Sequence, residues 1–226
     1  MTWFDPVDLY CERVDLAFWG EPFNAISNLA FLLAAASAIA ERRRRGLTDW
    51  PTLLLCLIAF TVGLGSFLFH TFANRWAELA DIVPIWTFVT VYLVVCIMRL
   101  RRRQASARRV GMLVALALAA PALWILSSQA TPAPAGLHDP FNGSLQYAPA
   151  VAALAGFALM LSQRRHSVAS WIWAATAAFA VALVFRTVDL RLCTALATGT
   201  HFIWHLLDGL TVGLLLQAML RLAPRA

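Results

Sequence analysis

The sequence predicts an all-α integral membrane protein: a bundle of seven transmembrane helices that forms one domain over residues 1–226. The prediction depends on composition, on the lengths of the apolar stretches and on the distribution of arginine. Of the 226 residues, 61% are hydrophobic and 13% are charged, and the mean hydropathy is +0.70. Soluble domains contain about 45–50% apolar and about 25% charged residues. The composition therefore excludes an ordinary soluble domain.

Seven apolar stretches have the length that crosses a bilayer as a helix, roughly 17–25 residues. They are 24–41, 51–70, 81–98, 110–128, 147–162, 168–187 and 201–220. The fifth stretch is the shortest, and its boundaries are the least defined by the sequence. The chain contains no internal repeat, so one domain accounts for it.

Arginine sets the predicted orientation in the membrane. The sequence has 18 basic residues, all of them arginine. Most lie at 42–45, 99–109 and 164–165 and in the C-terminal tail, which all fall on one side of the predicted bundle. By the positive-inside rule this side is cytoplasmic, so the N-terminus lies outside and the C-terminus inside. Basic residues confined to short loops also argue against nucleic-acid binding, despite a pI near 9.9. The alanine-rich, lysine-free composition favours a bacterial inner membrane.

Three histidines are predicted to meet at the outer, periplasmic face. His201 and His205, in THFIWHLLD, are spaced i and i+4, so they project from one side of the last helix. His70 ends the second predicted helix at the same face. Three protein ligands and one water are the usual arrangement of a catalytic zinc ion. A single histidine near a helix end is more often an interfacial residue, which is our interpretation of His138 and His166.

Further polar residues are expected beside the histidines. Ser66 lies one turn before His70, and Asp81 is expected to open the third helix. Asp208 follows His201 by seven residues on the same helical face, where we expect it to support the site through a hydrogen bond. Ionisable groups at membrane depth are costly, so their grouping indicates a functional site.

The motifs resemble those of the alkaline ceramidase family, within a superfamily of seven-helix membrane hydrolases that includes the adiponectin-type receptors. The resemblance covers nearly the whole chain and is carried by YCE at 10–12, EPFNAISN at 21–28, GSFLFH at 65–70, DIVP at 81–84, DLRLC at 189–193 and HFIWH at 201–205. It implies zinc-dependent cleavage of the amide bond of ceramide or a related N-acyl lipid to a fatty acid and a sphingoid base. It also implies that His70, His201 and His205 bind zinc, and that Ser66 and Asp81 act in the reaction.

The family also has a calcium site in its N-terminal segment, which this sequence matches in part. Glu12 and Glu21 correspond to family ligands, and Tyr10 has a carbonyl oxygen to offer. Leu9 and Val14 stand where the family has Asp and Asn. Asp8 or Asp15 is the candidate substitute.

Two cysteines, Cys11 and Cys193, fall on the predicted outer and oxidising side, where a disulfide is plausible. The resemblance implies the same pair. Cys56 and Cys96 fall inside helices and are interpreted as core residues.

Two other functions use the same residues. One is an intramembrane serine hydrolase in which Ser66 is the nucleophile and a histidine the base. The other is a non-catalytic receptor or sensor with structural zinc. Loss of activity on chelation distinguishes the zinc enzyme from the serine enzyme. Formation of a hydrolysis product distinguishes either enzyme from the receptor.

Overall fold

The computed structural model describes residues 2–101 and 139–223, and every regular element in these ranges is a helix. The elements are α1 (Pro22–Ser27), α2 (Leu29–Arg44), α3 (Trp50–Phe72), α4 (Arg75–Arg101), the 3₁₀ helix η1 (Ser144–Tyr147), α6 (Ala148–Gln163), α7 (Ala169–Leu192) and α8 (His201–Leu222).

Six helical segments in the described part of the chain are long and apolar enough to cross a membrane. They are Pro22–Arg44, Trp50–Phe72, Arg75–Leu100, Ser144–Gln163, Ala169–Leu192 and His201–Leu222. The predicted helix at 110–128 lies outside the described residues. The count of seven therefore stays a prediction, while the all-helical membrane class is confirmed.

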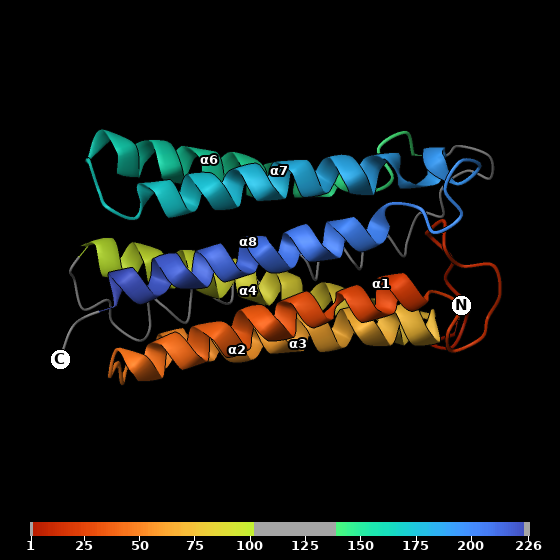
Figure 1. Cartoon of the computed structure of the whole chain (residues 1–226), viewed down its shortest axis with the longest axis horizontal. Coiled ribbons are helices and arrows are strands. Elements are labelled where there is room, and N and C mark those ends of the chain that lie inside the picture. Colours follow the sequence, from red (N-terminus) through yellow and green to blue (C-terminus); the bar gives the residue numbers. More distant parts are fainter. Residues whose placement is uncertain (1, 102–138, 224–226) are drawn as a thin grey trace.

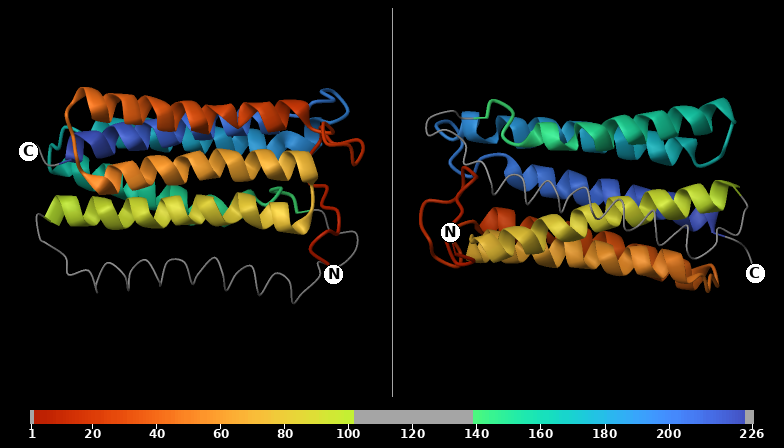
Figure 2. Two further views of the ribbon diagram at one scale, coloured as in Figure 1. Left: turned by 90° about the horizontal axis from the view of Figure 1, so that it is seen from below. Right: turned by 180° about the vertical axis from the view of Figure 1, so that it is seen from behind.

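The helices run nearly parallel to the long axis of the molecule (Figure 1). Helix α3 packs against α2 and α4, and α6 packs against α7. Helix α8 contacts both α2 and α7, and Figure 2 shows that it joins the α6–α7 pair to the rest of the bundle. Helix α8 is therefore packed between neighbours on two sides.

Two helix boundaries differ from those expected. Helix α4 begins at Arg75, so Asp81 lies inside it and does not open it. The backbone N–H of Ala77 bonds to the side chain of Asn74, which gives the helix its early start. Helix α7 continues to Leu192, five residues past the expected end at 187, so Asp189 is helical and not part of a loop. Charged residues suggested a loop there, but Asp189 is buried with partners of its own.

The first predicted helix, 24–41, is two helices separated at Asn28. Pro22 occupies the first turn of α1, where its missing N–H is not needed. Helix α3 begins with a side-chain cap: the carboxylate of Asp49 accepts a hydrogen bond of 3.1 Å from the backbone N–H of Thr52.

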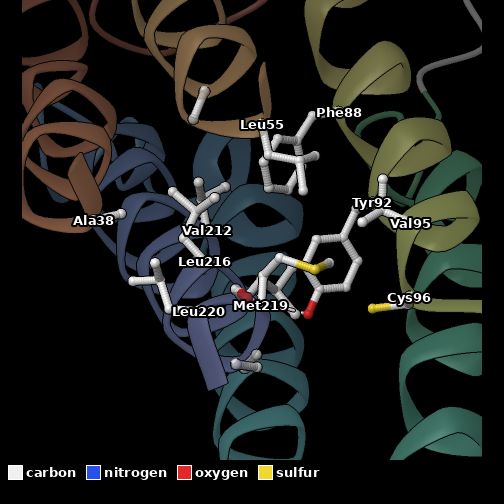
Figure 3. Close-up of a cluster of buried hydrophobic side chains, with 14 of the residues drawn as sticks. Ala38, Leu55, Phe88, Tyr92, Val95, Cys96, Val212, Leu216, Met219 and Leu220 are labelled. Carbon is white, nitrogen blue, oxygen red and sulfur yellow. Dashed lines mark hydrogen bonds between the residues drawn. The ribbon is translucent and has the colours of Figure 1, made fainter. Parts of the chain in front are cut away.

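The core lies between α2, α3, α4 and α8, and Figure 3 shows part of it, including Leu55, Tyr92 and Leu216. Cys56 and Cys96 are fully buried here, as predicted. The outer surface is also apolar: Leu33 is 69% exposed, Val184 57% and Leu210 52%. Large apolar side chains at this exposure would be unfavourable in water, and they indicate a surface that faces lipid.

The two ends of the bundle differ in charge. The end of α2 and the α6–α7 connection, which carry arginine runs, lie at the end where the chain terminates (Figure 1). The N-terminal segment, the end of α3 and the start of α8 lie at the opposite end. The separation agrees with the predicted topology, while the orientation relative to the membrane stays a prediction.

Candidate metal centre

Three buried histidines meet at the end of the bundle that holds the N-terminal segment. His70 comes from the last turn of α3, and His201 and His205 come from the first two turns of α8. One ligand atom of each lies within 4.8 Å of the other two. The three side chains belong to residues that are at most 2% exposed. No other group of three histidine, cysteine or acidic residues in the described ranges meets in this way.

The hydrogen bond of His70 fixes its tautomer. Its Nδ1 lies 2.5 Å from Oε2 of Glu21, and a carboxylate can only accept, so Nδ1 carries the proton. Nε2 therefore has a free lone pair, and this atom is buried without a hydrogen-bond partner. A carboxylate behind a histidine is the usual support of a metal-binding imidazole. Burial would raise the pKa of Glu21, but the hydrogen bond from His70 and the charge of Arg13 outweigh it, so this pKa is lowered.

His205 is fixed in the same way by Ser27. The Ser27 hydroxyl donates its single proton to the carbonyl oxygen of Asn24 at 2.9 Å. It lies 2.8 Å from Nδ1 of His205, so the hydroxyl accepts this second bond and Nδ1 is the donor. Nε2 of His205 is left unprotonated, as a metal ligand requires.

His201 is held by its backbone and by stacking. Oδ1 of Asp189, on α7, accepts from the backbone N–H groups of Thr200 at 2.6 Å and His201 at 2.9 Å, which caps the start of α8. The ring of His201 stacks on Tyr10, with centroids 3.6 Å apart. Its Nδ1 is buried without a partner.

Gly199 makes the capping turn possible. Its φ is +58°, and an added Cβ would lie 2.2 Å from Oδ1 of Asp189. Any other residue would strain the backbone of the turn, and its Cβ would clash with the carboxylate of Asp189. Glycine is therefore required at this position.

The three imidazoles fit a zinc ion. Two have protons fixed on the far nitrogen, two have an unpartnered buried nitrogen, and one ligand atom of each lies within 4.8 Å of the other two. Three neutral nitrogen ligands with an open fourth position are typical of catalytic zinc.

Ser66 and Asp81 line the same cavity as His201 and His205, and its volume is about 680 Å³. A close approach of α3 and α4 brings them together: a Cβ on Gly65 would lie 1.9 Å from the carbonyl oxygen of Ala80. Oδ1 of Asp81 is buried without a hydrogen-bond partner among the described residues. An acceptor is therefore available beside the histidines.

Sequence reasoning missed Arg186, which also lines this cavity. Its Nη1 donates to the hydroxyl of Tyr10 at 2.8 Å, and its guanidinium lies 5.4–5.5 Å from the rings of Tyr10, Tyr147 and Trp204. Burial raises the pKa of Tyr10 to about 12, although the charge of Arg186 opposes this effect. Tyr10 is therefore a neutral phenol at physiological pH that supports His201.

Asp208 lies where two cavities meet. It lines the polar cavity and also an apolar cavity of about 90 Å³. Its Oδ1 is buried and has no partner within the described part of the chain. Support of the metal site by Asp208 stays a prediction.

The residues predicted for calcium do not fit this ion. Calcium takes six to eight oxygen ligands. Both carboxylate oxygens of Glu12 accept backbone N–H groups, from Phe23 at 2.7 Å and Asn24 at 2.8 Å. The carboxylate of Asp15 is exposed and accepts from Ala17.

The carboxylate of Glu21 is also engaged by other partners. It is held by Arg13, Asn24 and His70. Asp8 lines the polar cavity. No calcium-dependent step is therefore part of our account.

A disulfide joins Cys11 to Cys193, with their Cα atoms 5.4 Å apart. Oδ2 of Asp189 accepts from the backbone N–H of Cys11 at 3.1 Å. The N-terminal segment is thus attached to α7 directly beside the residue that caps α8.

Fold and site together define a helical membrane protein with a buried three-histidine centre of the kind used in metal-dependent hydrolysis. A family model described as Ceramidase matches residues 10–223. The chain belongs to this family, whose activity is hydrolysis of the amide bond of ceramide. Among curated proteins, none matches the sequence.

Proposed function

We propose that this protein is a zinc-dependent intramembrane hydrolase that cleaves the amide bond of ceramide or a related N-acyl lipid. The observation that carries the proposal is the set of three buried imidazoles with ligand atoms within 4.8 Å of one another. Membership of the ceramidase family supports the lipid amide as substrate. Zinc, when bound, supplies a Lewis acid that activates water and polarises a carbonyl group.

Asp81 and Ser66, which lie beside the metal centre, have separate roles in the proposed reaction. Asp81, with a buried carboxylate oxygen that lacks a partner, accepts the proton of the attacking water and passes it to the leaving amine. Ser66 donates a hydrogen bond to the oxygen on which negative charge develops. Both are held at the same wall of the cavity by the close packing of α3 and α4.

The two adjoining cavities suit a substrate in which an apolar group is joined to a polar one. The apolar cavity shares Phe31, Val62, Ile85, Tyr147 and Asp208 with the polar one. Its other lining residues are almost entirely apolar and come from α4, α6, α7 and α8. We infer that the acyl chain lies in the apolar cavity while the amide lies beside the histidines.

Substitution of Ser66 and Asp81 tests the assigned roles. Ser66→Ala should keep its zinc and lower kcat by about 10²–10³, the usual effect of losing an oxyanion donor. Asp81→Asn should also keep most zinc and lose most activity. Ser37→Ala, an exposed serine on α2, is the matched control and should behave as the parent. If Ser66→Ala or Asp81→Asn hydrolyses ceramide at the parental rate, the assigned role of that residue is wrong.

The serine-hydrolase alternative receives no support from the geometry. Among the described contacts, no hydrogen bond joins Ser66 to a histidine, whereas His70 and His205 bond to Glu21 and Ser27. A serine enzyme would also retain its activity after chelation. We place the reaction in an inner membrane, with the site near the periplasmic face.

A further inference from the structure

A buried arginine lies among the residues that the family resemblance relates to calcium. Arg13 directly follows Glu12 and is 5% exposed. Its Nε donates to Oε1 of Glu21 at 2.6 Å, its Nη1 to the carbonyl of Asp15 at 3.0 Å, and its Nη2 to the carbonyl of His70 at 2.8 Å. One guanidinium thus binds three oxygen atoms, two from the N-terminal segment and one from α3.

We propose that Arg13 is a built-in cation that replaces calcium in this chain and holds Glu21 in place behind His70. A calcium ion would gather carboxylate and carbonyl oxygens of the N-terminal segment around one positive charge. Arg13 gathers the same kinds of oxygen around a covalently attached charge. Its planar fork of donors reaches several acceptors at once, which a lysine ammonium does not reproduce.

The surrounding chain is shaped to this guanidinium. A Cβ on Gly20 would lie 2.8 Å from Nη1 of Arg13 and 2.9 Å from the carbonyl oxygen of Asp15. A side chain at position 20 would therefore displace either the arginine or the carbonyl that it binds.

The arrangement links the N-terminal segment to the metal centre. Arg13 binds one oxygen of Glu21, and the other oxygen of Glu21 accepts from Nδ1 of His70. Arg13 also binds the backbone carbonyl of His70 directly. Arg13 is thus a positioning residue for His70, and it makes no contact with the ring nitrogen that faces the centre.

Calcium binding tests the replacement directly. The parent protein in detergent should bind no calcium in equilibrium dialysis, and its melting temperature should be the same in calcium-free buffer and in about 5 mM calcium. A calcium site with a Kd of about 10⁻⁴–10⁻³ M would raise the melting temperature by roughly 2–9 °C at this concentration. Stoichiometric calcium bound by the parent, lost on Glu21→Gln, would overturn the proposal.

Two matched variants isolate Arg13. Leu9→Asp with Val14→Asn restores the family's calcium residues but keeps Arg13, and it should remain unable to bind calcium. Adding Arg13→Ala to this pair should create calcium binding and a melting temperature that rises with calcium. Equal calcium binding by the two variants would show that Arg13 does not occupy this position, and a folded triple variant without calcium binding would also contradict the proposal.

Single substitutions keep the test decisive if the triple variant does not fold. Arg13→Gln should weaken zinc binding about tenfold, as expected when the support of a metal ligand is disturbed, and Arg13→Lys should fall between it and the parent. Arg43→Gln, on an exposed arginine, is the control. Parental zinc affinity and melting temperature in Arg13→Gln would refute the positioning role. The calcium measurements need neither zinc nor activity, so they stand apart from the proposed function.

Discussion

Removal of the Ser27 hydroxyl should weaken zinc binding without creating a large cavity in the protein. Ser27 is 8% exposed and His205 2%, and their side chains meet at 2.8 Å. In Ser27→Ala the Nδ1 proton of His205 loses this acceptor, and an unsatisfied buried donor costs about 1–3 kcal/mol. Since about 1.4 kcal/mol is a factor of ten in an equilibrium constant, the zinc Kd should rise roughly 10-fold to 100-fold. Loss of an outer-shell partner has the same usual effect on metal sites.

The assay is a competition titration of purified protein with a zinc chelator of known affinity, in detergent at neutral pH. Ser37→Ala lies on α2 with an exposed side chain and should leave the Kd unchanged. A zinc Kd in Ser27→Ala within twofold of the parent would refute the argument that Ser27 fixes the tautomer of His205.

Three further predictions concern the rest of the molecule. Cys11 and Cys193 should resist alkylation until reductant is added, and free labelling of both before reduction would exclude the disulfide. Ala153→Phe, in the lining of the apolar cavity, should shift activity toward shorter acyl chains, with kcat/KM falling about fourfold for each methylene that no longer fits. The control Ala152→Phe, at an exposed position, should leave the chain-length preference unchanged. If Ala153→Phe has the same chain-length preference as the parent, the acyl chain does not lie in this cavity. Ala17→Cys, exposed in the N-terminal segment, should react with an impermeant maleimide in intact cells, whereas labelling only after permeabilisation would invert the topology.

Hydrophobicity and spacing were enough to predict the helical membrane class and the residues of the metal centre. A spacing of i and i+4 forces His201 and His205 onto one side of α8 whatever surrounds them. His70 could be added because it ends an apolar stretch at the same predicted face. These features follow from local periodicity, which a sequence contains directly.

The supports of the centre were missed because they depend on packing between distant segments. Ser27 and Asp189 stand in motifs that the resemblance had singled out, but their partners lie 178 residues from Ser27 on α8 and 178 residues from Asp189 at Cys11. The end of α7 was placed too early, at residue 187, because Asp189 and Arg191 interrupt the apolar stretch. Arg186 donates a hydrogen bond to Tyr10, and Asp189 accepts from the backbone at the start of α8, and no local pattern reveals either contact.

The calcium expectation depended on matching residue types at Glu12 and Glu21, and it overlooked Arg13 between them. A positive charge directly after Glu12 was visible in the sequence, but its burial was not. Family spacing identifies which oxygens gather at a place in the fold. The structure is needed to identify the partner of each oxygen.

The central claim is tested most directly by measuring zinc and lipid hydrolysis on the same purified protein. We expect about one zinc ion per chain, as the three-histidine site requires. Release of fatty acid from ceramide should stop on chelation and return when zinc is added back, and His205→Ala should lose both metal and activity. Protein without stoichiometric zinc, or ceramide hydrolysis that persists after complete chelation, would contradict the account.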